Sequence, residues 1–200
     1  LDNTYIIFLS DNGSSPGTPL IYPGATRAWL RGNRDMDPEH VGRKGTQSNL
    51  SFGWVSVANG PLALFKATTF EGGIRTPFLM SGPGIEPSGF VSGYGHVKDV
   101  APTLYQLAGI DAATDPVFSD RKRPEGQSLL TLLTDDQPDR APVVTELFGN
   151  WSVTDGKWKL LQVGPPMGDG KPELYDLLND LGETRNVASR HPEIVARLTA

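Results

Sequence analysis

The sequence contains no cysteine, and this absence excludes several kinds of chemistry at once. A disulfide framework, a thiolate metal site and a cysteine nucleophile all need that residue, although its absence does not fix the cellular compartment. Long apolar runs are missing as well. The longest, residues 5–9, falls far short of the roughly 20 residues that a helix needs to cross a bilayer. No stretch resembles a signal peptide or a spanning helix, and we expect any targeting segment to lie upstream of Leu1.

An excess of positive charge is also absent. The chain carries 18 Lys and Arg against 23 Asp and Glu, a formal net charge of −5. This balance gives no general attraction to nucleic acid or to an anionic membrane surface. Glycine (23 residues) and proline (17) are plentiful, which favours long ordered loops and short elements over a helical bundle. With 200 residues the chain can form one domain, or a domain with a small appendage.

The first apolar run ends abruptly at a polar turn. Residues 5–9 predict a short strand buried on both faces, because they are apolar without alternation. Ser10-Asp11-Asn12-Gly13 follows. In open α/β sheets ligands bind beyond the carboxyl ends of the strands, which would place the Asp11 and Asn12 oxygens where chemistry usually occurs. The same tetrapeptide is also ordinary turn chemistry, with Gly13 free to adopt positive φ.

The rest of the chain predicts an α/β portion followed by a small antiparallel sheet. We expect a second buried strand at 78–80, a helix in "HVKDVAPTLYQLAGI" and a short helix in "SLLTLLTD". Beyond Pro138 the pattern predicts three or four antiparallel strands, with a hairpin turn at Asp155-Gly156, and a final helix in "HPEIVARLTA". These patterns place a boundary between an α/β portion, residues 1–137, and a sheet subdomain, residues 138–200.

Residues 14–60 show poor periodicity and are too many for a simple connection. We expect a functional excursion or partial disorder there. Its basic residues, Arg27, Arg31, Arg34, Arg43 and Lys44, outnumber the acidic residues Asp35, Asp37 and Glu39. A solvated charged loop is the simpler interpretation, and an anion-facing rim is the alternative.

The stretch "FKATTFEGGIRTP" combines a lysine, an acid and a glycine pair. Lys66 is a compact charge on a long stem, suited to an anionic oxygen, and it precedes glycines that allow close backbone approach. Glu71 could orient a neighbouring cation or cap backbone amides, and Arg75 leads into the next strand. Taken alone, Lys66 is more often a surface lysine than a site residue.

Four motifs in order carry a family resemblance: "SDNG" ending a strand, "LFKATTFEGGIRTPFLMSGPG", "HVKDVAPTLYQLAGI" and "ELYDLLNDLGETRNVA". Together they resemble the later part of a type I sulfatase of the arylsulfatase group. The resemblance covers nearly the whole chain and is weakest at 14–60 and 111–140. It implies an alkaline-phosphatase-like α/β fold, a mixed sheet flanked by helices, with a small C-terminal antiparallel sheet. It also implies hydrolysis of a sulfate ester at a bound divalent cation.

The resemblance assigns roles to three residues. Asp11 and Asn12 correspond to ligands of the cation, usually Ca²⁺, with Mg²⁺ as the alternative, and hard oxygen donors suit either ion. Lys66 corresponds to the lysine that contacts the sulfate and the leaving oxygen. The family's nucleophile is a formylglycine made from a C/S-x-P-x-R motif. Ser14-Ser15-Pro16 and Ser81-Gly82-Pro83 lack the arginine of that motif, so we expect the formylglycine upstream of Leu1, in a longer parent chain.

Two rival functions stay open on the sequence. One is a phosphomonoester or phosphodiester hydrolase of the same superfamily, although three histidines are few for its metal ligands. The other is a non-catalytic homologue that binds anionic glycans through the arginine-rich excursion. The sequence does not decide between a small aryl sulfate and a sulfated glycan as substrate, nor does it fix compartment or oligomeric state.

Weaker site candidates are two histidines and three aromatic residues. His96 could be an acid–base group, but a packed or helix-entry histidine is the stronger interpretation, and His40 fits a surface role better than the substrate entrance. Trp151, Trp158 and Tyr175 could form a sugar platform, although a sheet packed on the main domain is the stronger interpretation.

Overall fold

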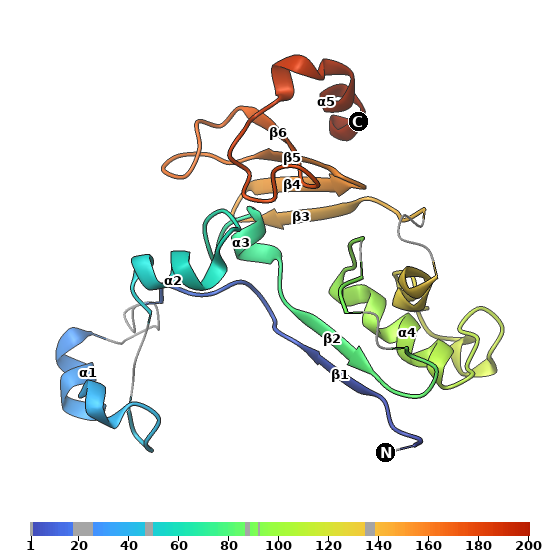
Figure 1. The fold of residues 1–200 in the computed structure, drawn as a ribbon, viewed down its shortest axis with the longest axis horizontal. Coiled ribbons are helices and arrows are strands. Elements are labelled where there is room, and N and C mark those ends of the chain that lie inside the picture. The colour runs from blue at the N-terminus through green and yellow to red at the C-terminus, as the bar shows by residue number, and fades with distance from the viewer. Residues whose placement is uncertain (1, 18–25, 47–49, 87–88, 92, 135–138) are drawn as a thin grey trace.

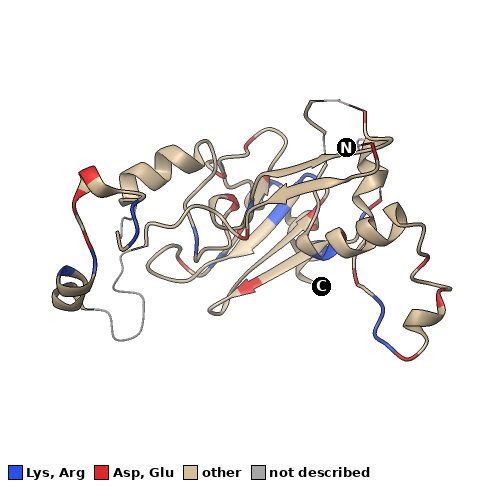
Figure 2. Ribbon diagram, turned by 90° about the horizontal axis from the view of Figure 1, so that it is seen from below, with Lys and Arg blue, Asp and Glu red and all other residues tan. Residues whose placement is uncertain are grey.

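The computed structural model describes residues 2–17, 26–46, 50–86, 89–91, 93–134 and 139–200 (Figure 1). Within these ranges the chain forms a two-stranded ribbon, several short helices around it, and a separate four-stranded sheet near the C-terminus. No helix in the described ranges is both long and apolar enough to cross a membrane. Figure 2 shows positions of Lys and Arg and positions of Asp and Glu spread over the molecule, and neither strand of the two-stranded ribbon contains a charged residue.

The ribbon consists of β1 (Ile6–Leu9) and β2 (Phe78–Ser81), paired antiparallel with Leu9 opposite Phe78. The two predicted strands therefore exist, but the expectation that both are buried is wrong. Ile6 and Phe8 are 53% and 61% exposed, and Leu79 is 58% exposed. Each strand has one strand partner within the described residues, and the ribbon's faces are not fully covered, so an apolar sequence here does not amount to burial.

The antiparallel register has a direct consequence for the predicted site. Because Leu9 lies opposite Phe78, the residues that follow β1 run beside the residues that precede β2. The turn formed by Ser10, Asp11, Asn12 and Gly13, called the Asp11 turn below, therefore lies next to α3 (Glu71–Ile74). This short helix is formed by the Glu-Gly-Gly stretch.

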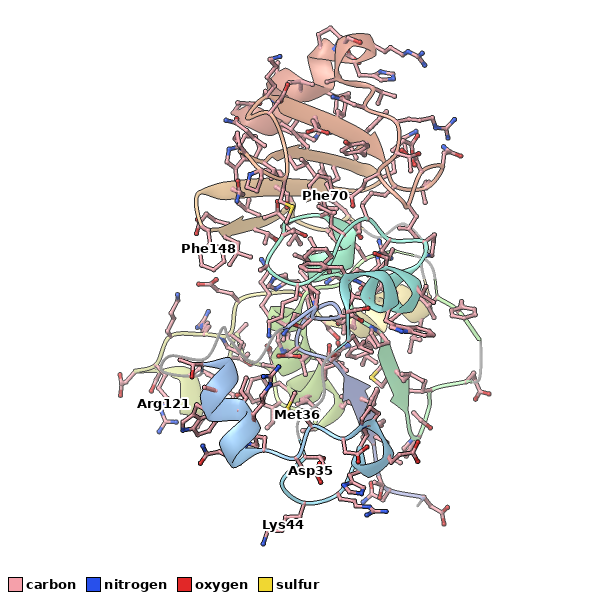
Figure 3. All side chains as sticks on the ribbon, turned by 90° about the vertical axis from the view of Figure 1, so that its left-hand side faces the viewer. Asp35, Met36, Lys44, Phe70, Arg121 and Phe148 are labelled. Atoms are coloured by element: carbon pink, nitrogen blue, oxygen red, sulfur yellow. The ribbon has the colours of Figure 1, made fainter. Side chains whose placement is uncertain are left out.

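The excursion contains short elements rather than one open loop: α1 (Arg27–Asn33), the 3₁₀ turn η2 (Pro38–His40) and α2 (Phe52–Asn59). Parts of it, residues 18–25 and 47–49, lie outside the described residues. The side chains of Arg31, Arg34, Arg43 and Lys44 are exposed, as a solvated charged segment requires. Figure 3 shows Lys44 extending away from the rest of the molecule.

The predicted helix after residue 96 is confirmed as η3 (Val97–Asp99) followed by α4 (Val100–Leu107). Gly109 just beyond it has φ of +72°, a left-handed conformation that glycine adopts without strain. Buried Asp99 accepts a hydrogen bond from the His96 amide at 2.8 Å and pairs with buried Arg140 at 2.5 Å. Short 3₁₀ turns follow: η4 (Pro116–Phe118) and η5 (Leu129–Leu133), the latter confirming the short helix predicted there.

The C-terminal sheet is confirmed as four antiparallel strands in sequential order: β3 (Val143–Leu147), β4 (Asn150–Asp155), β5 (Trp158–Gln162) and β6 (Pro172–Asp176). The predicted hairpin turn is present one residue later than expected: Asp155 ends β4 and pairs with Trp158, so Gly156 and Lys157 are the two central residues, with Gly156 at φ of +59°. The turn η6 (Ala188–Arg190) and the predicted final helix, α5 (Pro192–Thr199), complete the chain. The boundary predicted near residue 137 lies outside the described residues.

Two apolar clusters cover the two faces of this sheet. On one face Leu160 and Leu174 pack with Leu198 of α5. On the other face Leu161, Val163, Tyr175 and Leu177 pack with Phe70, the residue that immediately precedes α3. In Figure 3 the labelled Phe70 lies between the sheet and the helical region below it. The sheet is thus sandwiched between α5 and the segment that carries the predicted site.

Candidate functional site

The structure brings together the segments that carry the three predicted site residues. The Gly13 amide donates a hydrogen bond to the Gly73 carbonyl of α3 at 3.0 Å. The Lys66 amide donates to the Ser14 carbonyl, also at 3.0 Å. Asp11 and Asn12 directly precede the first contact, and Lys66 makes the second. The backbone of the "SDNG" turn is therefore joined to both the lysine and the glycine pair.

Gly13 is needed here for its lack of a side chain. It is not at positive φ, so the expected reason for a glycine at this position is wrong. A Cβ added to it would lie 1.7 Å from the Gly72 carbonyl oxygen, a separation that no side chain tolerates. Gly72 is equally confined, since its Cβ would lie 2.3 Å from the Ala63 and Leu64 carbonyl oxygens. The close backbone approach predicted for the glycine pair is confirmed.

Asn59, the last residue of α2, forms side-chain hydrogen bonds to the same segments. Its Oδ1 accepts a hydrogen bond from the Ser14 amide at 3.2 Å. Its Nδ2 donates to the carbonyls of Leu64 at 2.9 Å and Gly72 at 2.8 Å. The side chain is nearly buried, so these bonds satisfy polar groups that water does not reach freely. Sequence analysis did not identify this residue.

Lys66 lies on a strained loop with its side chain in solvent. Leu64 and Ala67 on either side of it have φ of +56° and +73°, left-handed conformations that residues with a Cβ seldom adopt. Such strain is found preferentially at functional sites, where the surrounding structure maintains it. Within the described ranges the Lys66 side chain forms no ion pair, so its ammonium group is available to an anion.

Asp11 and Asn12 present oxygen atoms at the surface of the turn. Asp11 is exposed and Asn12 half-buried, and the Ser10 hydroxyl lies 3.5 Å from an Asp11 carboxylate oxygen. No group of three or more His, Cys, Asp or Glu side chains suited to a metal ion occurs among the described residues. The chemistry of a carboxylate beside an amide oxygen fits a hard divalent cation, but two donors are part of a coordination sphere rather than all of it.

Behind the glycine pair lies a network of four charged side chains, in which Glu71, Lys159 and Glu183 are buried and Arg75 is exposed. The Glu71 carboxylate accepts from Arg75 Nε at 2.5 Å and from Lys159 Nζ at 3.0 Å. Lys159, in β5, also lies 2.8 Å from Glu183 Oε1. The second Glu183 oxygen accepts from the Glu71 amide at 2.7 Å. Glu71 therefore orients neighbouring cations, as its sequence context suggested, while Lys159 and Glu183 were not anticipated.

The network perturbs its two carboxyl groups in opposite directions. Burial by itself raises the pKa of Glu71, but the charges of Lys159 and Arg75 outweigh it and hold that pKa below its ordinary value. For Glu183 burial is the larger influence, and its pKa lies above the ordinary value despite the neighbouring Lys159 charge. Glu71 is thus the firmly ionised partner of the two cations.

The weaker candidates take structural roles. His96 caps η3, with its Nδ1 accepting from the Lys98 amide at 3.2 Å, which confirms the helix-entry interpretation. His40 pairs with Asp35 at 2.7 Å on the excursion. Tyr175 is buried against the cluster that contains Phe70, and Trp158 packs on the opposite face of the sheet and against the His191 ring. Packing against the main domain is therefore confirmed for Tyr175, whereas Trp151 and Trp158 pack on the face of the sheet that α5 covers.

Comparison with known proteins gives a consistent result. Residues 1–110 match the sulfatase family. The arylsulfatase of Klebsiella aerogenes is 41% identical over 111 residues, which cover 54% of this chain and 24% of that protein. An uncharacterized sulfatase of Schizosaccharomyces pombe is 30% identical over 203 residues, covering 99% of this chain and 37% of the relative. An N-acetylgalactosamine-6-O-sulfatase of Bacteroides thetaiotaomicron is 26% identical, with 99% and 35% covered.

Solved structures support the same fold. One, from work on glycosaminoglycan metabolism by Bacteroides thetaiotaomicron, has a TM-score of 0.67 at 24% identity and covers 99% of this chain and 38% of its own. The PsFucS1 sulfatase of Pseudoalteromonas has a TM-score of 0.60 at 21% identity, covering 99% of this chain and 36% of its own. At these identities the likeness establishes the alkaline-phosphatase-like fold, of which this chain forms part.

The chain spans about a quarter to two fifths of the length of these relatives, with 24% and 38% as the extremes. Their names are those of sulfatases, so the phosphate-ester and non-catalytic alternatives are not favoured. The family match over more than half of the chain settles the relationship: this chain belongs to the sulfatase family.

Proposed function

We propose that this chain forms part of a sulfuric ester hydrolase, in which Asp11 and Asn12 hold a divalent cation and Lys66 contacts the sulfate. The observation that supports this most directly is the backbone contact between Lys66 and Ser14, which joins the lysine to the Asp11 turn. An acid–amide pair and an available ammonium group thus occur on joined segments of a sulfatase-family chain.

Lys66 serves the reaction through its charge. Cleavage of a sulfate ester transfers negative charge to the departing oxygen, and a fixed ammonium group stabilises that charge. The lysine is held at its backbone by the Ser14 carbonyl and by the strained loop between Leu64 and Ala67, while its stem is free to reach the ester. This arrangement favours the transition state over the ground state, because the charge grows as the bond breaks.

The cation that fits the donors is Ca²⁺, with Mg²⁺ as the alternative. Asp11 and Asn12 would hold it through a carboxylate and an amide oxygen, together with ligands from elsewhere in the enzyme. When bound, such an ion acts as a Lewis acid toward sulfate oxygens. The formylglycine nucleophile belongs to a segment outside this chain, so the chain by itself supplies part of the site.

The substrate class is a sulfate ester, either small or carried on a glycan. One structural neighbour, Ps i-CgsB, was solved with a neocarrahexaose, and it is 22% identical to this chain. A relative is named as a sulfatase of N-acetylgalactosamine. These names support a glycan sulfate as one candidate, and an aryl sulfate is the other, as the name of the Klebsiella relative suggests.

The first test is Lys66→Ala in the enzyme that contains this chain, assayed with p-nitrophenyl sulfate. We expect kcat to fall about 10²-fold or more with a smaller change in metal content, because the lysine acts on charge that develops in the transition state. Lys171→Ala is the matched control, since Lys171 is also exposed and lies on a loop of the C-terminal sheet. Turnover near the wild-type value in Lys66→Ala would remove this lysine from the site.

The second test addresses the cation. Asp11→Ala should lose bound metal and activity together, because it removes an anionic ligand. Asn12→Ala should lose less metal, since a neutral ligand is removed. Asp169→Ala, an exposed acid in a turn of the C-terminal sheet, is the control. Elemental analysis that finds full metal content in both variants of the Asp11 turn would return "SDNG" to a turn without a metal role.

A further inference from the structure

We propose that Lys159 is a positioning residue, through which the C-terminal sheet holds α3 and thereby aligns the Asp11 turn with Lys66. The inference rests on the proposed function for what the site does, and on the described contacts for how it is held. Nothing in the motif resemblance assigns Lys159 a role, and it lies 93 residues after Lys66 in the sequence.

The first step is the burial of Lys159. Its side chain has no exposed surface, although it carries a charge, and it lies on the same face of the sheet as Leu161 of β5 and Val163, which follows the strand. A buried ammonium group is costly unless it is paired, and here it contacts Glu71 and Glu183 at 3.0 and 2.8 Å. With Arg75 the network contains two positive and two negative groups. Removing Lys159 leaves two carboxyl groups facing one another in the interior.

The second step is a bond from the network to the backbone of α3. Glu71 is the first residue of this helix, and its amide has no partner within the helix. Glu183 supplies that partner at 2.7 Å. Glu183 itself has φ of +51°, a left-handed conformation that requires support from its surroundings. Lys159 provides this support by binding the Glu183 carboxylate, so it fixes the amide end of α3 as well as the Glu71 side chain.

The third step is the set of contacts that link α3 to the Asp11 turn and to Lys66. The Gly73 carbonyl accepts from Gly13, and the Gly72 carbonyl accepts from Asn59, which in turn binds the Ser14 amide. Gly13 packs so closely on Gly72 that the turn cannot stay in place when the helix shifts. The Ser14 carbonyl then binds the Lys66 amide. Every contact in this path involves a backbone group.

A buried ion pair by itself is weak evidence for stability, and replacing one with apolar groups is often neutral. A positioning role is therefore distinguished from a purely stabilising role by which backbone amides exchange faster after the substitution. If Lys159 only stabilises the fold, its loss should affect all amides that exchange through global unfolding. If it positions the site, its loss should loosen the amides of the Asp11 turn and Lys66 while distant parts of the sheet stay protected.

The experiment is hydrogen exchange, followed by mass spectrometry or NMR, on the protein and its Lys159→Met variant. We expect the Gly13 and Lys66 amides to exchange about tenfold faster, with little change in β4 and α5. Lys157→Met is the matched control. Lys157 is two residues away, half-exposed, and pairs with Asp176 at 3.1 Å, so its loss should leave the Gly13 and Lys66 amides unchanged.

A milder variant, Glu71→Gln, keeps the test usable if Lys159→Met does not fold. It preserves the size of the side chain and the bond from its amide to Glu183, and it leaves Lys159 paired with Glu183. We expect about threefold faster exchange at Gly13 and Lys66. Exchange at these two amides that matches wild type, or that rises equally across the whole chain, would overturn the positioning role.

These measurements do not depend on catalysis. An enzyme without sulfate-ester turnover would contradict the proposed function and leave the exchange result as it stands. Normal turnover with unchanged exchange in Lys159→Met would contradict the positioning role alone. Where both proposals hold, Lys159→Met should lower kcat for p-nitrophenyl sulfate more than it raises KM, because misalignment of Lys66 weakens transition-state contacts most.

Discussion

At the scale of single residues, the absence of a side chain at Gly13 matters as much as the presence of one at Lys66. Gly13 joins the end of β1 to α3 through its amide, and the Gly72 carbonyl occupies the space in which a Cβ would lie. The predicted metal ligands therefore sit on a turn whose position is fixed by backbone contact. A glycine chosen for turn chemistry alone would tolerate small displacements, and this one does not.

This packing predicts the effect of Gly13→Ala. The added methyl would lie 1.7 Å from the Gly72 oxygen, so the turn or α3 must move. We expect a loss of about 1–3 kcal/mol in the free energy of unfolding, as is typical for overpacking. Denaturant unfolding measures it. Gly53→Ala is the control, because Gly53 lies in α2 with nothing within 4 Å of its added Cβ. Equal stability of the two variants would contradict the close approach.

At the scale of elements, local patterns were enough for the sheet and the helix. The strands β3 to β6 follow from their apolar patterns and the Asp155-Gly156 turn, and α4 follows from helical spacing closed by Gly109. These signals are contained in windows of about ten residues, which is the range over which turn and helix preferences act. The burial of β1 could not be predicted in this way, because it depends on which elements cover the strand.

In the candidate site, too, some residues could be predicted from local sequence and others depend on tertiary contacts. Motifs were enough to propose Asp11, Asn12 and Lys66 as site residues, but not to identify Asn59 and Lys159, because the contacts of these two residues form only when distant segments come together. One signal was present in the sequence. Lys159 has the same strand parity as Leu161 and Val163, so alternation places its charge on the apolar face of β5. A lysine in such a position predicts a buried acidic partner, but not which acid supplies it.

At the scale of the whole molecule, the sequence suggested two portions with a boundary near residue 137, and we retain that division as a proposal. Their packing shows that they share one core. Phe70, from the first portion, contributes to the cluster of Leu161, Val163, Tyr175 and Leu177 in the second. The ionic network of Lys159 crosses the same interface. The C-terminal sheet therefore packs directly on the segment that carries the candidate site rather than forming an independent appendage.

Phe70→Ala tests this shared core. Phe70 is 7% exposed and packs against the sheet immediately before α3, so its truncation leaves a cavity between the two portions. We expect a loss of about 3–5 kcal/mol, the usual cost of truncating a buried phenylalanine. Because the cavity borders both portions, tryptophan fluorescence and circular dichroism of the whole chain should report one cooperative transition at a lower temperature. Replacing Trp29 and Trp54 by Phe leaves Trp151 and Trp158, both in the sheet, as the fluorescent reporters. Phe148→Ala is the control: Phe148 is 81% exposed at the β3–β4 turn and points outward in Figure 3, so its loss should change stability by less than about 0.5 kcal/mol. Two separate transitions in Phe70→Ala, with the sheet melting at its wild-type temperature, would show that the portions fold independently and would remove the structural basis for coupling the sheet to the site.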